Sequence, residues 1–152
     1  MCLSGKKGVL GMLIEDHRKV QKLFKDYKSA KDSAVKLRIV QSTCASLSAH
    51  TEIEEQHFYP FLRTADQNVF GSLLDEATVE HASAKDLIAQ LQNMKPDDAL
   101  YDARFTVLGE YINHHVKEEE DELFPKVISK DIDLRELTTL MEQAKEKLMS
   151  RT

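Results

Sequence analysis

The residues of this chain that are best suited to bind a metal ion occur in a short pattern that is present twice. A histidine stands four residues before a glutamate at His50 and Glu54 and again at His115 and Glu119, and a second glutamate follows each pair. On a helix, positions i and i+4 lie one above the other, about 6 Å apart along the axis, so an imidazole and a carboxylate can reach the same ion. A proline falls six positions after the first glutamate in both copies. The pattern therefore predicts two metal half-sites on facing helices.

Two further histidines, His17 and His81, interrupt apolar helical stripes in the segments between these copies. His17 precedes His50 by 33 residues and His81 precedes His115 by 34, so the two halves of the chain have the same order. One histidine on an apolar face is usually a hydrogen-bonded core residue, but here four helices each carry one. Burying four imidazoles and two carboxylates without a cation costs several kcal/mol per charged group. The candidate metal ligands are therefore His17, His50, Glu54, His81, His115 and Glu119.

The chemistry of these ligands limits the metal. Imidazole and carboxylate without thiolate suit iron, manganese or zinc, and carboxylates that can bridge two ions favour a dinuclear centre. Six protein ligands are too many for one tetrahedral zinc and too few to saturate two six-coordinate irons. Water, oxide or an exogenous ligand must then fill the remaining positions, which are where chemistry would occur.

Helical periodicity predicts an all-α chain, in which four long helices position these ligands. The expected ranges are about 9–29, 34–64, 68–94 and 99–125, with a fifth helix at about 133–149. Short connections favour an up-down-up-down four-helix bundle with the additional C-terminal helix packed outside. Pro60 either closes the second helix or kinks its last turn. Residues 1–152 are expected to form a single domain with a core bundle over about 9–128.

The composition excludes several classes of function. A net charge of −5 argues against nucleic-acid and anionic-membrane partners, because both require a basic surface. Cys2 and Cys44 cannot build a disulfide framework or a thiolate zinc site. The chain lacks a signal-like segment and any apolar run of membrane-spanning length, so a soluble, cytoplasmic protein is expected. The oligomeric state is not predicted.

The motifs resemble those of the hemerythrin-like, or HHE cation-binding, domains over about 9–128. The resemblance rests on Asp16-His17, His50-x-x-x-Glu54-Glu55 leading to Tyr59-Pro60, Glu80-His81, and His115-x-x-x-Glu119-Glu120 leading to Phe124-Pro125. It implies two iron ions in a non-heme di-iron centre, oxo- or hydroxo-bridged, held by the six candidate ligands. It also implies that Glu54 and Glu119 are the bridging carboxylates and that the partner is a small diatomic molecule or a peroxide.

One departure from that family pattern bears on function. Oxygen-carrying hemerythrins place two histidines one turn apart on the third helix, whereas the residue four before His81 is Ala77. An iron with one ligand fewer has more room for water, peroxide or nitric oxide, and it suits a reversible oxygen carrier less well. The expected function is therefore binding or reduction of oxygen, nitric oxide or peroxide.

Other functions stay open at this point. They are an iron or oxygen sensor or store, a di-iron protein of the kind associated with iron–sulfur cluster repair, and a structural bundle that binds metal passively. The sequence identifies no clear proton donor, so it does not decide whether the protein is an enzyme.

Neighbouring residues carry weaker predictions. His114 could bind the centre only if its helix were rotated, with Glu118 as its partner at i+4. His57 is expected to lie outside the ligand shell or at the surface, because the corresponding residue of the second copy is Glu122. A ferritin-like site is not expected, since it needs two Glu-x-x-His patterns and only Glu54-x-x-His57 is present. Tyr111 is expected in the core. Together with Leu13, Phe24, Leu47 and Phe58 it would shield the metals.

Overall fold

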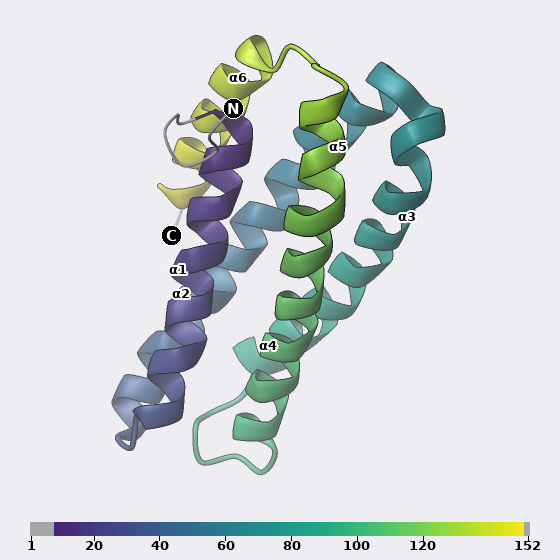
Figure 1. Ribbon diagram of the computed structural model, residues 1–152. Helices are drawn as coiled ribbons and strands as arrows, with labels where there is room; N and C mark the ends of the chain where they lie inside the picture. The colour runs from purple at the N-terminus through teal and green to yellow at the C-terminus, as the bar shows by residue number, and fades with distance from the viewer. Residues whose placement is uncertain (1–7, 151–152) are drawn as a thin grey trace.

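The computed structural model describes residues 8–150, and all regular secondary structure within that range is helical. The elements are α1 (Val9–Ser29), α2 (Ser33–Ile53), η2 (Glu54–Phe58), α3 (Tyr59–Gln92), α4 (Tyr101–Glu118), η3 (Glu119–Leu123), α5 (Phe124–Ser129) and α6 (Arg135–Met149). Four long helical rods run alternately up and down, with α6 outside them (Figure 1). The predicted all-α bundle with an additional C-terminal helix is confirmed.

The second and third rods meet between the ranges that the sequence predicted for them, about 34–64 and 68–94. Helix continues past Pro60, and the reversal of direction comes at Asp66, whose φ of −163° and ψ of 87° interrupt α3. The first rod is α1, and the second comprises α2, η2 and the start of α3. The rest of α3 is the third rod, and α4, η3 and α5 form the fourth. Pro60 does not close the second rod.

A π-helical turn explains how each proline is accommodated. In η2 the amide of Tyr59 donates to the carbonyl of Glu54, five residues earlier, and in η3 Phe124 donates to Glu119 in the same way. The next residue in both copies is a proline, which has no amide hydrogen and whose ring collides with the carbonyl four residues before it. Widening the preceding turn relieves that collision. Both turns begin at a candidate metal ligand, as π turns at functional sites often do.

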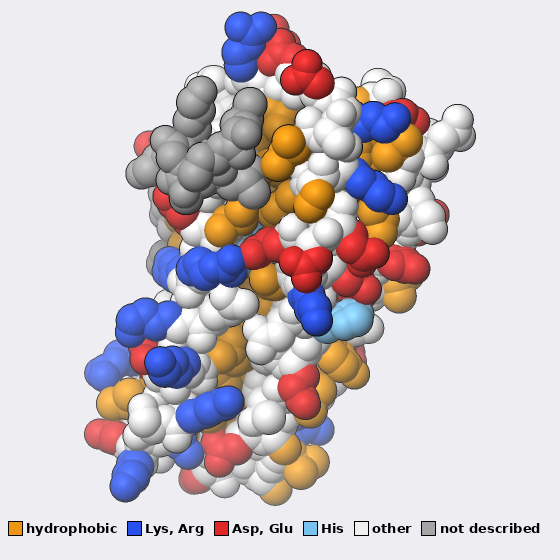
Figure 2. All heavy atoms as spheres, viewed as in Figure 1, with side chains coloured by type: hydrophobic (Ala, Val, Ile, Leu, Met, Phe, Trp, Pro, Cys, Tyr) orange, Lys and Arg blue, Asp and Glu red, His pale blue; other side chains and the backbone are white. Residues whose placement is uncertain are grey.

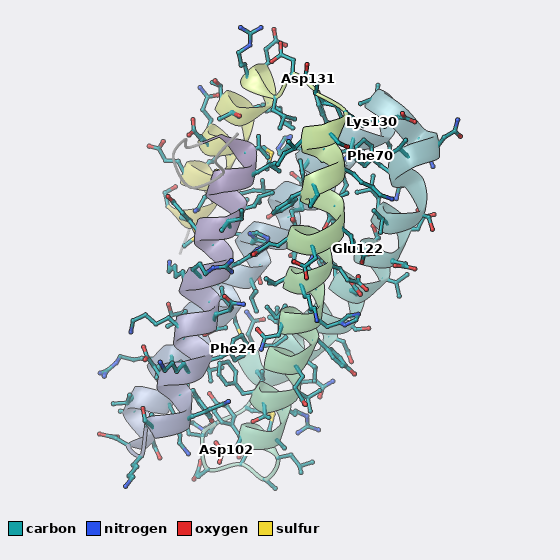
Figure 3. All side chains as sticks on the ribbon, in the orientation of Figure 1. Phe24, Phe70, Asp102, Glu122, Lys130 and Asp131 are labelled. Atoms are coloured by element: carbon teal, nitrogen blue, oxygen red, sulfur yellow. The ribbon has the colours of Figure 1, made fainter. Side chains whose placement is uncertain are left out.

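The interior consists of two apolar clusters. One, the end cluster, joins the start of α1 to α5 and α6 and contains Phe58, Tyr59 and Phe124. The other, the loop cluster, lies toward the loop before α4 and contains Val20, Leu47 and Phe105. Phe70 packs in the end cluster and Phe24 against the loop cluster, far apart along the bundle (Figure 3). Along every rod the candidate histidine falls at the boundary between the two clusters, so the ligands form a polar layer between apolar regions.

The additional helix covers one corner of the bundle. α6 contacts α1, α2 and η2, and its Leu137 and Met141 are buried in the end cluster. Thr138 accepts a hydrogen bond from the amide of Val9, which fixes the start of α1. None of the helices in residues 8–150 is long and apolar enough to cross a membrane.

Candidate metal centre

Two groups of buried side chains lie in the polar layer, and each could hold a metal ion. Site A comprises His17, His50 and Glu119. Site B comprises Glu54, His81 and His115. Within each group the possible ligand atoms lie within 4.8 Å of one another. All six residues that the sequence identified as candidate ligands are thus brought together, one or two from each rod.

The two glutamates lie between the sites. Glu119 places Oε1 at 3.1 Å from Nε2 of His17 in site A and Oε2 at 3.3 Å from Nε2 of His115 in site B. Glu54 places Oε1 at 3.4 Å from Nε2 of His50 and 3.1 Å from Nε2 of His81. Each carboxylate therefore faces both sites, which is the position that bridging requires.

A second set of carboxylates fixes the orientation of the four imidazoles. Each ligand histidine donates its Nδ1 hydrogen to an acidic side chain of the preceding rod, and the first rod receives its carboxylate from the fourth. The pairs are His50 with Asp16 (3.0 Å), His81 with Glu55 (2.6 Å), His115 with Glu80 (2.8 Å) and His17 with Glu120 (2.7 Å). These four bonds form a closed ring around the bundle. With Nδ1 used in this way, Nε2 is the nitrogen of each imidazole that is left to bind a metal.

The signal for this ring was present in the sequence. Each of its acids stands next to a candidate ligand in the chain, as Asp16 does beside His17 and Glu55 beside Glu54. Adjacent residues point about 100° apart on a helix, so the neighbouring acid reaches sideways to the next rod while the ligand points inward. Sequence reasoning named these acids as part of the motif but gave them no contact.

Positively charged or titratable groups lie outside the ring. Arg18 contacts Glu120, Lys85 contacts Glu55, and Lys145 of α6 contacts Asp16. Glu80 instead contacts His114 at 3.3 Å. The additional helix thereby contributes to the ligand environment, because Lys145 holds the carboxylate that orients His50.

Several buried polar atoms of the site have no hydrogen-bond partner, which tests whether a cation fits. Nε2 of His17, Nε2 of His50, Oε2 of Glu54 and Oε1 of Glu119 are of this kind. Nε2 of His81 lies 3.1 Å from Nε2 of His115, so two inward lone pairs face each other unless a proton or a metal separates them. Buried polar groups without partners are costly, and one cation in each site would satisfy the six candidate ligands. The donor set therefore fits a pair of transition-metal ions.

The pKa values of the site also indicate that its carboxylates favour a nearby positive charge. Burial opposes charge on His50, but the carboxylates of Glu54 and Asp16 outweigh burial and raise its pKa to about 10. The pKa values of His17 and His115 are also raised against burial, chiefly by Glu119. Burial acts to raise the pKa of Glu54, yet His50 and its other partners hold it well below the usual value. Protons therefore balance the carboxylates where a metal does not.

Tyr59 is the polar residue of the centre to which the sequence gave no role. Its hydroxyl donates to Oε2 of Glu119 at 2.6 Å and lies 3.2 Å from Oε1 of Glu54. It also lies 3.4 Å from Nε2 of both histidines of site B. On a regular helix a residue five after Glu54 would point well away from it, but the π turn of η2 brings Tyr59 back to the same face. The equivalent residue in the other copy is Phe124, whose ring stacks on His17, so the hydroxyl is specific to one half.

A small cavity opens directly onto the four histidines. Its volume is about 20 Å³. Its apolar wall on the loop-cluster side is formed by Val20, Leu47, Ile112 and Val116. A space of this size admits a water molecule or a diatomic ligand and little more.

The other residues expected near the site differ in how deeply they are buried. The prediction that Tyr111 lies in the core is wrong, since 46% of its surface is exposed, and Ile112 occupies the inward position instead. Leu13, Leu47 and Phe58 are buried and Phe24 is half-buried, as expected for a shield. Ala77 is buried one turn before His81 and offers no ligand atom. His57 is half-buried in η2 and belongs to neither site.

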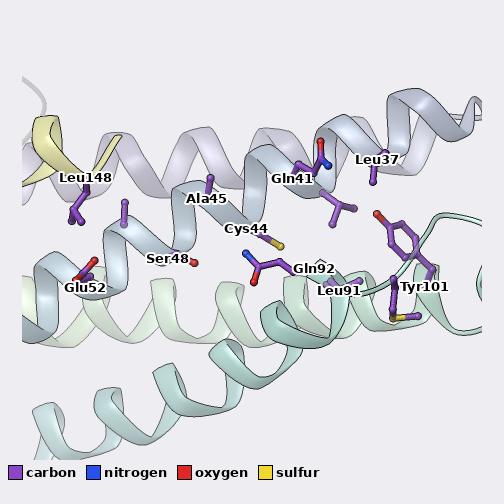
Figure 4. Close-up of a pocket in the computed structure, with 13 residues that line it drawn as sticks. Leu37, Gln41, Cys44, Ala45, Ser48, Glu52, Leu91, Gln92, Tyr101 and Leu148 are labelled. Atoms are coloured by element: carbon purple, nitrogen blue, oxygen red, sulfur yellow. The ribbon is translucent and has the colours of Figure 1, made fainter. Parts of the chain in front are cut away.

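A groove that is much larger than this cavity is separate from the centre. It runs along α2 toward the end of α3, has a volume of about 500 Å³, and is lined by residues such as Gln41, Cys44 and Tyr101 (Figure 4). Burial raises the pKa of the Cys44 thiol to about 11, so this thiol is not a thiolate nucleophile at neutral pH. The other cysteine, Cys2, lies outside the described residues. The groove contains no candidate ligand.

Comparison with known proteins identifies one family. The model of the hemerythrin HHE cation-binding domain matches residues 9–127. An uncharacterized hemerythrin-like protein of Schizosaccharomyces pombe is 26% identical over 113 residues, which are 74% of this chain and 56% of that protein. A protein of Nostoc sp. named DNA nickase is 27% identical over 113 residues, which are 74% of this chain and 31% of that protein. The chain thus spans about a third and just over half of these two relatives.

A solved structure supports the fold. The crystal structure of a hemerythrin HHE cation-binding domain-containing protein from Mycobacterium kansasii superposes with a TM-score of 0.79. The match covers 95% of this chain and 88% of the other, at 22% sequence identity. At this identity the likeness establishes the shared helical bundle.

Proposed function

Because the chain belongs to the hemerythrin HHE cation-binding domain family, we propose that sites A and B hold a pair of non-heme iron ions, where the protein binds or reduces oxygen, nitric oxide or peroxide. The observation that carries the proposal is the closed ring of outer carboxylates. It orients four imidazole lone pairs toward two glutamates that face both sites. Iron, when bound, would supply the redox change and open positions for a ligand.

The protein residues would have three tasks at such a centre. Glu54 and Glu119 would balance the charge of the ions and set their separation. The outer acids would make the imidazoles better ligands and hold them in one orientation. The apolar clusters on either side would keep bulk water from the site, which limits uncontrolled oxidation.

The size and position of the cavity support a small ligand. Its roughly 20 Å³ lies against the histidines and is walled by aliphatic side chains, so it suits an apolar diatomic or a peroxide better than an organic substrate. The groove along α2 is large enough for an organic molecule but is not lined by any of the candidate ligands.

Anaerobic loading with ferrous iron, followed by metal analysis and optical spectra, tests the proposal. We expect one iron per buried site, and distinct spectral changes when oxygen, nitric oxide and peroxide are added separately. Loss of peroxide in excess of the iron present would show turnover. A chain that takes up zinc alone, or iron without any response to the three ligands, would contradict the proposal and favour a structural bundle that binds metal passively.

Tyr59→Phe tests how the one hydroxyl of the centre contributes. Burial, together with the charges of Glu119 and Glu54, raises the pKa of Tyr59 well above its usual value, so the phenol keeps its proton and can act as a hydrogen-bond donor. We expect iron content to be unchanged and the rate of peroxide consumption to fall roughly a hundredfold, a typical contribution for a positioned proton donor. Stopped-flow spectroscopy across a pH range measures the change. Tyr111→Phe removes an exposed hydroxyl and is the matched control; equal rates in both variants would exclude the role.

A further inference from the structure

The ring of outer carboxylates has one member that differs from the other three. Glu120, Asp16 and Glu55 each contact a permanently charged side chain, Arg18, Lys145 and Lys85 respectively. Glu80 contacts His114 instead, with Nε2 at 3.3 Å from Oε2. Within residues 8–150, no lysine or arginine nitrogen makes an ion pair with Glu80.

A second carboxylate makes this position more acidic still. Glu118 lies one turn after His114 on α4 and places Oε1 at 3.0 Å from the same Nε2. The ligand atoms of Glu80, His114 and Glu118 all lie within 4.8 Å of one another. Two carboxylates therefore converge on one imidazole. The other three outer carboxylates each pair with a lysine or arginine instead.

The group is accessible from solvent and distinct from sites A and B. The His114 side chain is 66% exposed, and Glu80 and Glu118 are partly exposed. Acidic side chains gather across the middle of the face formed by α4 and η3, with a histidine at their edge (Figure 2). A hydrated cation can approach this face without crossing the apolar interior. One imidazole and two carboxylates, with water in the remaining positions, suit a divalent first-row metal.

We propose that Glu80, His114 and Glu118 form a third metal site, which takes a divalent transition-metal ion at the surface of the protein. An ion there supplies the positive charge that Arg18, Lys145 and Lys85 supply to the other outer carboxylates. Glu80 connects the exposed site with the buried centre. Its Oε2 faces the exposed site, and its Oε1 accepts the Nδ1 hydrogen of His115, a candidate ligand of site B, at 2.8 Å. A metal ion in the exposed site would therefore affect the orientation of the His115 imidazole.

Titration with Co²⁺ under anaerobic conditions tests the third site. The iron-loaded full chain is titrated by calorimetry, and bound cobalt is counted by elemental analysis after gel filtration. We expect wild type to bind one more cobalt ion than His114→Ala, and Glu118→Gln to bind that ion at least ten times more weakly. His57→Ala removes a histidine that belongs to none of the three groups, so it should match wild type. Circular dichroism establishes that the variants fold.

The expected difference of one ion between wild type and His114→Ala does not depend on what the buried sites hold. A protein without iron would fill them with cobalt in both variants, and the difference would persist. Failure of the iron proposal is therefore distinguishable from failure of this one. Equal cobalt binding by wild type and His114→Ala would overturn the third site.

Discussion

Replacing His50 with alanine is expected to abolish metal binding at site A. The substitution removes one of three protein ligands there and leaves Asp16 without the imidazole that it orients. Loss of an outer partner of a ligand typically costs 10- to 100-fold in metal affinity, so loss of the ligand itself should cost more. Because Glu54 lies 3.4 Å from Nε2 of His50 and also belongs to site B, the remaining site should be weakened as well. Elemental analysis of the iron-loaded, purified variant should give at most one iron ion in the two buried sites.

Glu119→Ala should have the larger effect of the two. Its carboxylate faces His17 through one oxygen and His115 through the other, so its removal takes a ligand from the space between both sites. We expect almost complete loss of metal from the two buried sites. His57→Ala is the control for both variants, because His57 lies one turn beyond Glu54 in the same π turn but outside both sites. Full metal content in His50→Ala, or equal loss in His57→Ala, would show that the ligands have been assigned incorrectly.

The sequence could predict that the six candidate ligands lie together, because this follows from helix periodicity. His17, His50, His81 and His115 interrupt apolar stripes at matched spacing, and a bundle whose stripes face inward must bring such interruptions to one level. The same reasoning placed Glu54 and Glu119 beside them, one helical turn on. For these predictions it was enough that the apolar stripe of each rod faces the interior of the bundle.

Predictions that depended on the exact rotation of a helix about its axis were less accurate. Tyr111 and Ile112 flank the inward direction on α4 from opposite sides, and only packing against the neighbouring rods decides that Ile112 is buried and Tyr111 exposed. The motif included Tyr59, but nothing in the sequence shows the π turn that directs its hydroxyl toward Glu54 and Glu119. The sequence shows the two prolines that follow the π turns. Periodicity does not predict which turn of the rod widens to accommodate each proline.

The sequence could not predict contacts between segments that are distant in the chain. Lys145 reaches Asp16 from a helix that lies outside the matched family region, with 128 residues between them in the chain. No local pattern pairs a lysine in the last helix with an acid in the first. The pairing of each outer acid with the histidine of the next rod likewise depends on the order of the rods around the bundle, which periodicity does not give.

Removing the metal is expected to destabilise the protein increasingly as the pH rises. In the metal-free chain, the raised pKa values of His17, His50 and His115 mean that folding favours their protonated forms. That contribution is complete below the unfolded histidine pKa of about 6.5 and is lost as the pH rises through the folded values, about 10 for His50. Glu54 has a lowered pKa, so its contribution is present above about 4.5 and is lost only in acid. The metal-free protein should therefore be most stable near pH 5–6.5.

The metal-loaded protein should show the opposite trend. A bound ion requires the imidazoles to be deprotonated at Nε2, so protons compete with metal and the affinity rises with pH. A metal concentration 1,000 times the Kd adds about 4 kcal/mol to the free energy of unfolding. For a chain of this length that raises the melting temperature by roughly 8–16 °C. The difference between loaded and metal-free protein should thus widen from pH 6.5 to pH 9.

Thermal denaturation followed by circular dichroism, with and without chelator treatment, measures both trends on the same preparation. Between pH 6.5 and pH 9 the melting temperature of the metal-free protein should fall, while that of the loaded protein should hold or rise. His57→Ala should reproduce both curves, because the pKa shifts that carry the argument belong to residues of the two buried sites. A gap that stays constant or narrows with rising pH would mean that the buried histidines do not exchange protons for metal. The ring of carboxylates would then act as a packing device rather than as the support of a metal centre.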